Sequence, residues 1–272
     1  MRRVTVRFLL GYGPIETVPF AKQAEQDRSR ATPARKPNPM GNPSSVRLEG
    51  VTLRQAALVA GFAYLLNPVS YAEFTIYPKL VIPGNIGQTV ANISAHHGLF
   101  LGAIFCYLIN FIEDIVIAWA LYILLAPVNR ALSLLAALFQ LVYAAIALVG
   151  LFNLATAYRM ISTPEYHTLF ASGPFEAQID LLLHSFRYDY SLALVLFGIH
   201  LVLVGYLIVR SRYVPWWLGV ILIVNGLGWV TNSLQPYLYP DAPLDFIFIT
   251  FFGEIIFMLW LLIRGWKLQE PA

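Results

Sequence analysis

The chain has 272 residues, of which 58% are hydrophobic and only 12% are charged, and its mean hydropathy is +0.65. A soluble domain of this length does not normally have such a composition, so we predict an integral membrane protein. The formal net charge of +3 does not indicate a nucleic-acid partner, and a single cysteine, Cys106, excludes both an intrachain disulfide and a cysteine-rich metal site.

Residues 1–50 differ from the rest of the chain because they contain six prolines, many Lys and Arg residues and little apolar periodicity. This composition predicts a disordered cytosolic N-terminal tail, followed by a transmembrane domain over residues 51–268. The opening MRRVTVRFLLGYG has too short an apolar run for a signal peptide, and no small-residue cleavage site follows it. Met40 leaves open a second possibility, in which translation begins there.

Windows of about twenty apolar residues predict six transmembrane helices, which makes the fold an all-α polytopic membrane helix bundle. Their approximate ranges are 55–74, 99–125, 131–156, 190–209, 214–234 and 246–265. The connections after the second and fourth ranges are short, whereas the others are longer and rich in turn residues. We also expect an interfacial helix over residues 175–184, leading into the fourth span.

The basic residues are distributed unequally between the two sides of this bundle. Fifteen of the 18 Lys and Arg residues lie in the N-terminal segment or beside it, in connections on the same side, or after the last span; Lys79, Arg159 and Arg187 lie on the other side. By the positive-inside rule, we expect a multi-pass protein of the plasma membrane with both termini in the cytoplasm.

The second expected span, residues 99–125, carries two acidic residues near its middle, Glu113 and Asp114. Its length of about 40 Å at ~1.5 Å per residue exceeds the ~30 Å hydrocarbon core, so Asp114 lies near the bilayer midplane. An ionised carboxylate costs a few kcal/mol there, and we therefore expect it to face a cavity or a protein partner rather than lipid.

Two further ionisable residues, His200 and Glu254, fall at a similar depth. Segments 109–123 and 249–263 align without a gap, which places Asp114 on Glu254. The spans before these segments share the spacings of Arg54, Gly61 and Asn67 with Arg212, Gly219 and Asn225. This pattern favours parallel helical-hairpin repeats. The candidate functional residues are Asp114, His200, Glu254, Glu113, Asn67 and Asn225.

These residues leave three kinds of function open. Titratable carboxyls at the midplane favour a small-solute carrier, a proton-coupled carrier or a membrane sensor. A neutral acid that hydrogen-bonds two helices together would instead indicate a structural subunit or scaffold. An intramembrane enzyme using His200 is less favoured, because the chain has no GxSxG, HExxH, phosphate-loop or dinucleotide motif. We predict no catalytic residue, cofactor or metal; the lipid bilayer is the predicted partner, and the small-molecule ligand and oligomeric state stay open.

Several segments are similar to those of a known family. They are RQAALVAGFAYLL, ALYILLAPVNR, FGIHLVLVGYLIVRS and GEIIFMLWLLIRGW. Together they resemble, over residues 52–266, the bacterial membrane family called domain of unknown function 4386, and PVNR and the FGIH segment are the most specific parts. The resemblance implies a membrane protein with six or seven spans, and it implies no activity or functional residue.

Overall fold

A computed structural model describes residues 50–269, and every regular element in that part of the chain is a helix. This confirms the all-α fold class. The expected N-terminal tail, up to residue 49, lies outside the described residues.

Five segments of the described residues are long and apolar enough to cross a membrane. They are α6 (His97–Leu125), α7 (Arg130–Ser162), α9 (Ser172–Arg210), α10 (Trp216–Leu238) and the segment Ile247–Lys267. The last segment combines most of the 3-10 turn η2 (Asp245–Phe251) with α11 (Phe252–Arg264) and η3 (Gly265–Lys267). These five correspond to the last five of the six expected spans.

The first expected span is a broken helix rather than a continuous one. The helix α2 (Leu53–Leu66) begins with a capping box, in which Thr52 and Gln55 satisfy each other's backbone N–H groups. It ends before Asn67 and Pro68 because proline has no N–H to continue the helix and its ring clashes with the preceding turn. The side chain of Asn67 then accepts a hydrogen bond from the N–H of Val69, 3.0 Å away.

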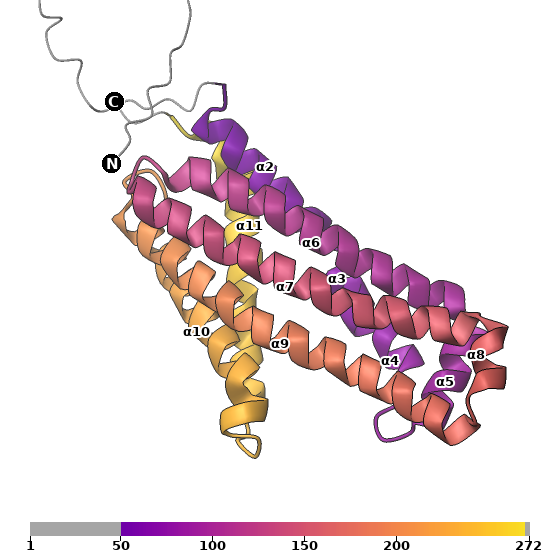
Figure 1. Ribbon diagram of the computed structural model, residues 1–272. Coiled ribbons are helices and arrows are strands. Elements are labelled where there is room, and N and C mark those ends of the chain that lie inside the picture. Colours follow the sequence, from indigo (N-terminus) through magenta and orange to yellow (C-terminus); the bar gives the residue numbers. More distant parts are fainter. Residues whose placement is uncertain (1–49, 270–272) are drawn as a thin grey trace, which may run out of the picture. The chain divides into compact units, whose positions relative to one another are not determined.

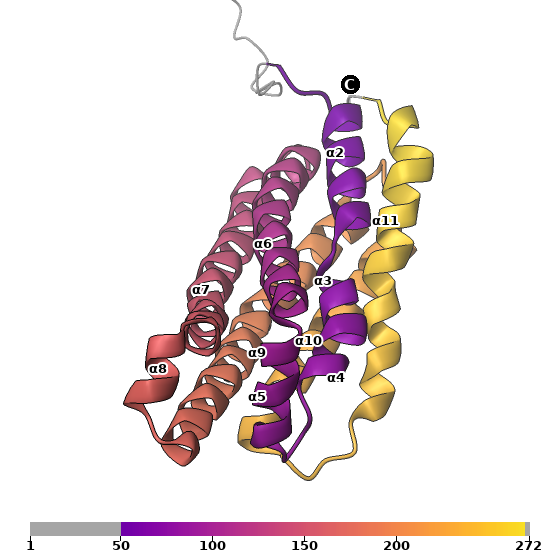
Figure 2. The same ribbon diagram turned by 90° about the vertical axis from the view of Figure 1, so that its right-hand side faces the viewer.

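Three short elements continue the chain beyond this break. They are α3 (Val69–Tyr71), the π-helical turn η1 (Ala72–Ile76) and α4 (Tyr77–Leu80). Figure 2 shows α2, α3 and α4 following one another along the direction of the bundle. The continuous helix expected over 55–74 is therefore wrong, and helix length alone does not establish a sixth span.

The interfacial helix expected over residues 175–184 is also not a separate element. It forms the first part of α9, which continues for 39 residues, because no glycine or proline interrupts the chain between Phe175 and Tyr190. At ~1.5 Å per residue α9 is about 58 Å long, well beyond the ~30 Å hydrocarbon core. The helix α9 is therefore longer than a membrane span requires, and α5 (Ile86–Ala95) and α8 (Pro164–Leu169) lie at the end of the bundle where α9 begins.

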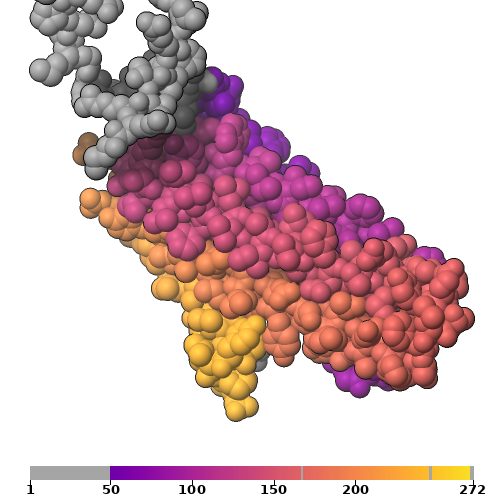
Figure 3. All heavy atoms as spheres, in the orientation of Figure 1, coloured from indigo at the N-terminus to yellow at the C-terminus, as the bar shows by residue number. Residues whose placement is uncertain are grey.

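The long helices pack in a closed order (Figures 1 and 2). Moving around the bundle, α2 packs on α6, α6 on α7, α7 on α9, α9 on α10, α10 on α11, and α11 again on α2. Large apolar side chains also point outward, among them Ile112 and Ile115 of α6 and Phe152 of α7. The face that carries α6, α7 and α9 is continuous in the space-filling view (Figure 3). Such extensive exposed apolar surface implies contact with a lipid bilayer.

Helices α9 and α10 approach each other most closely, and four glycines allow this. Gly198 faces the backbone of Gly226, and Gly205 faces that of Gly219. A Cβ atom added at any of the four would lie 2.4–2.6 Å from the opposite carbonyl oxygen. Small residues of this kind let membrane helices pack backbone against backbone.

Candidate functional site

Asp114 lies inside the bundle with hydrogen-bond partners on two helices. Its side chain is buried, and its Oδ2 accepts a hydrogen bond from Nδ2 of Asn110, one turn earlier on α6, at 3.1 Å. Its Oδ1 accepts a hydrogen bond from Nε2 of Gln140 on α7 at 2.7 Å. The Tyr143 hydroxyl also lies close enough to interact with the carboxyl. All these partners are neutral, and no described Lys, Arg or His forms an ion pair with Asp114.

Glu254 has a similar set of partners on the other side of the bundle. Its Oε1 accepts hydrogen bonds from Nδ2 of Asn225 and Nε1 of Trp229, both at 2.9 Å. These donors lie four residues apart on α10, so both face α11. Asn225 is fully buried and Glu254 is half-buried. The structure therefore places Asn225 and Glu254 together.

The two carboxyls form separate hydrogen-bonded groups, but Glu254 is near enough to act electrostatically on Asp114. Tyr64 of α2 interacts with both. Its hydroxyl is buried and has no hydrogen-bond partner among the described residues. Tyr64 thus brings the broken helix into the same polar interior as Asp114 and Glu254.

His200 lies apart from these carboxyls. Its ring is fully buried, and Nδ1 donates a hydrogen bond to the backbone carbonyl oxygen of Ala136 at 2.8 Å. The other ring nitrogen, Nε2, has no partner among residues 50–269. The small gap beside the ring, lined by Ala118, Ser133 and Val204 among others, has no room for a water molecule. His200 therefore has neither a carboxylate partner nor a solvent path in this arrangement.

The two other candidates from the sequence do not join these groups. Glu113 is half-buried, and its Oε2 lacks a hydrogen-bond partner among the described residues. Asn67 caps the break after α2 instead of contacting Asp114. The repeat pattern had matched Asn67 with Asn225, but only Asn225 contacts a carboxyl.

Glu73 and Arg187 form an ion pair that the sequence patterns did not predict. Nη1 of Arg187 on α9 donates hydrogen bonds to both carboxylate oxygens of Glu73 in the π-helical turn, at 3.0 and 2.8 Å. The Tyr107 hydroxyl donates a hydrogen bond to the same carboxylate. The guanidinium lies over the Tyr77 ring, 4.1 Å from its centroid. π-Helical turns often occur at functional sites. The sequence contained one signal for this pair: Glu73 lies within the first expected span, and the oppositely charged Arg187 lies just before the fourth.

Tyrosines connect this ion pair with Asp114. The rings of Tyr107 and Tyr190 lie edge to face with centroids 6.0 Å apart, and those of Tyr190 and Tyr143 are 6.4 Å apart. The hydroxyls of Tyr190 and Tyr143 interact, and Tyr143 in turn faces Asp114. A series of neighbouring polar side chains therefore leads from Glu73 to the carboxyl group of Asp114. Within residues 50–269, no cluster of three or more His, Cys, Asp or Glu residues could hold a metal ion.

Comparison with known proteins identifies the family. The chain is 35% identical over 159 residues to an uncharacterized protein of Archaeoglobus fulgidus, an alignment that covers 58% of this chain and 81% of the relative. No solved structure matches the chain. Residues 59–265 match the family model described as domain of unknown function (DUF4386), and these residues include the ion pair and both interior carboxyls. The chain therefore belongs to the DUF4386 family.

Proposed function

We propose that the chain crosses the plasma membrane six times, with the elements from Leu53 to Leu80 forming a discontinuous first span. These 28 residues would cover about 42 Å if fully helical, which is enough for the hydrocarbon core. The closed packing order supports this proposal, because α2 packs between α6 and α11, as a sixth membrane helix would. The uneven distribution of Lys and Arg supports cytoplasmic termini.

The protein acts as a proton-coupled carrier or sensor in which Asp114 gains and loses a proton. The observation that carries this proposal is the neutral environment of a buried carboxyl: Asn110, Gln140 and Tyr143 surround it, and no cation among the described residues compensates a negative charge. An ionised carboxylate is costly there, so its charge state responds to any ligand or conformation that changes access of water or cations. Glu254 is the second group of this kind.

The discontinuous span favours a carrier or sensor over a simple scaffold. Transporters commonly place ion and substrate sites where a membrane helix is interrupted. Here the interruption provides Glu73, and the tyrosines Tyr107, Tyr190 and Tyr143 lead from it to Asp114.

Replacement of Asp114 by Asn tests the proposal. Asn keeps the size of the side chain and can hydrogen-bond but cannot titrate, so the melting temperature in detergent should change by the equivalent of at most ~1 kcal/mol. Infrared difference spectra between about pH 5 and about pH 9 report protonated carboxyls through their C=O stretching band. We expect wild type to lose such a band as the pH rises, and Asp114→Asn to lack the part of the band that comes from Asp114 while it keeps the part that comes from Glu254. Glu165→Gln, on the exposed helix α8, is the matched control and should retain the band.

A structural role is the second candidate, and the dry packing beside His200 favours it. In that case Asp114 only joins α6 to α7 through Gln140. Identical infrared spectra for wild type and Asp114→Asn across this pH range would rule out proton coupling at this residue and leave the structural role. The enzyme hypothesis has less support. The hydrogen-bonded ring nitrogen of His200, Nδ1, contacts a backbone carbonyl oxygen, so it is not paired with a carboxylate as an acid or base would be.

A further inference from the structure

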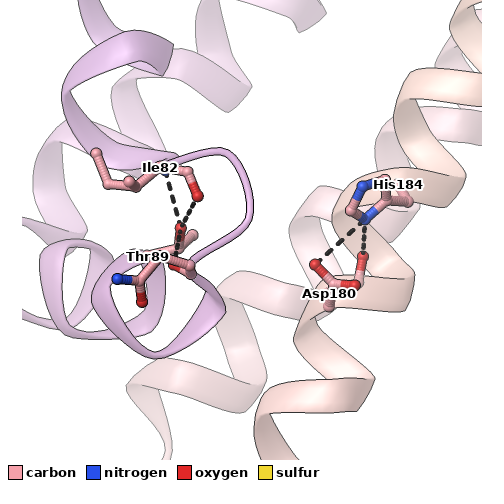
Figure 4. Close-up of polar contacts among 5 residues, drawn as sticks. Ile82, Thr89, Asp180 and His184 are labelled. Carbon is pink, nitrogen blue, oxygen red and sulfur yellow. Dashed lines mark hydrogen bonds and ion pairs between the residues drawn. The ribbon is translucent and has the colours of Figure 1, made fainter.

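A groove of about 700 Å³ opens at the end of the bundle where α9 extends beyond the length of a membrane span. Its walls come from η1, α4, the loop before α5, the first turn of α5 and the first half of α9, and they are mostly apolar, including Val81, Ile82 and Leu183. Figure 4 shows Ile82 and Thr89 on one side and Asp180 and His184 on the other. A largely apolar groove with a few converging polar groups is a typical small-molecule site.

The loop wall of this groove is held in place by its own hydrogen bonds. The Thr89 hydroxyl oxygen accepts a hydrogen bond from the N–H of Ile82 at 2.9 Å (Figure 4). The Asn85 side chain accepts one from the N–H of Gln88 at 3.0 Å. Gly84 turns the loop with φ +72°, a conformation that favours glycine. The chain's own hydrogen bonds thus hold this wall of the groove, which lowers the entropic cost of ordering it on binding.

The charged groups of the groove leave one negative charge uncompensated. Arg187 is neutralised by Glu73, 2.8 Å away. Among residues 50–269, the ion-pair partner of Asp180 is His184, whose Nδ1 lies 3.3 Å from Oδ1 of Asp180 and 2.9 Å from its backbone oxygen. No described residue donates a hydrogen bond to the other carboxylate oxygen, Oδ2. The side chain of Asp180 is 49% exposed and lines the groove, so a ligand can reach it.

We infer that this groove binds a small organic cation. Its ammonium group pairs with the free oxygen of Asp180, and its apolar body lies against Val81, Ile82 and Leu183. Arg187, which lines the groove, lies 23 residues before Arg210, the C-terminal residue of α9. This separation is about 35 Å of helix, longer than the ~30 Å hydrocarbon core, so the groove lies at or beyond the edge of that core. The ammonium can therefore belong to a free amine or to an aminophospholipid headgroup. This inference does not depend on proton exchange at Asp114.

Three probes of similar size and different charge test the inference. They are phenethylamine, phenethyl alcohol and phenylpropionate, each measured by equilibrium dialysis against the full chain in a neutral maltoside detergent. We expect phenethylamine to bind most tightly. Asp180→Asn should weaken its binding by about 3- to 10-fold, the usual effect of losing one partly exposed charged contact. Glu165→Gln removes a carboxylate outside the groove and should leave the affinity unchanged.

A second variant separates loss of the site from loss of the fold. Ile82→Trp should narrow the groove and weaken phenethylamine binding while Asp180 is retained. Added phosphatidylethanolamine that displaces phenethylamine would assign the ammonium to a lipid, and failure to displace it would assign it to a free amine. Equal binding of the three probes, tighter binding of phenylpropionate, no binding, or an unaltered affinity in Asp180→Asn would each overturn the inference.

Discussion

Acidic side chains within the bundle are stabilised in two different ways. Asp114 and Glu254 accept hydrogen bonds from neutral amide and indole groups, whereas Glu73 pairs with a guanidinium. The difference follows depth, because Arg187 lies about 35 Å from the far end of α9 and can keep contact with water at the end of the bundle. A cation in the interior of the bundle could not reach water in this way, so it would add a second desolvation cost to that of the carboxylate.

Replacement of Arg187 by Gln should destabilise the protein. The change leaves the half-buried Glu73 carboxylate with the Tyr107 hydroxyl as its remaining hydrogen-bond donor among the described residues. We expect the free energy of unfolding to fall by about 2 kcal/mol, less than for a fully buried pair because the Arg187 side chain is 40% exposed. Denaturation in mixed micelles measures this change.

The double variant Glu73→Gln/Arg187→Gln provides the control for this ion pair. It removes both charges, so it should recover about 1 kcal/mol relative to Arg187→Gln alone. If the effects of Glu73→Gln and Arg187→Gln on the free energy of unfolding simply add in the double variant, the two charges have no interaction energy.

Glycine has opposite effects at different positions along the long helices. Gly226 of α10 is required by close approach, since an added Cβ would lie 2.5 Å from the carbonyl oxygen of Gly198 and 2.9 Å from the N of Val202. Gly102 of α6 has no atom within 4 Å of the corresponding position. Replacement by alanine should therefore change the free energy of unfolding in opposite directions at these two sites.

We predict that Gly226→Ala lowers the free energy of unfolding by about 1–3 kcal/mol, because α9 and α10 must move apart. Gly102→Ala is the matched control and should raise the free energy of unfolding by about 0.5–1 kcal/mol, since alanine restricts the unfolded chain. Melting temperatures in one detergent measure both. Equal effects of the two substitutions would contradict the close packing of α9 against α10.

The orientation of the whole bundle can be read from the two ends of α9. In the proposed topology α9 crosses the membrane, so the connection after α7 and the connection after α9 lie on opposite sides of the bilayer. Gly173, in the first turn of α9, is exposed with open space around it, and Ser211 follows the end of the same helix. These two positions therefore report the orientation of the chain.

Cysteine introduced at Gly173 should react with an impermeant thiol reagent in intact cells, and cysteine at Ser211 should react only after the cells are lysed. Both variants are made with Cys106 replaced by alanine, because this half-buried residue of α6 is the chain's single cysteine. The Cys106→Ala protein alone gives the background. Labelling at Ser211 in intact cells would reverse the proposed orientation.

Hydropathy by itself predicts the all-α class and the last five expected spans, because a long apolar run in a bilayer must form a helix to satisfy its backbone. It also places Asp114 at mid-depth within such a run. The break at Asn67 and Pro68 was readable from proline chemistry, but apolar residues on both sides of it outweighed that signal.

Only the tertiary structure decides which polar groups meet. It pairs Glu254 with Asn225 and Trp229, gives Asp114 the unforeseen partner Gln140, and leaves Asn67 at a helix break. Glu73 and Arg187 are 114 residues apart in the chain and still form an ion pair. Such contacts depend on the rotation and order of whole helices, which are set by packing of small residues against neighbouring backbones. Apolar periodicity carries little information about that packing, because lipid-facing and buried positions are both apolar.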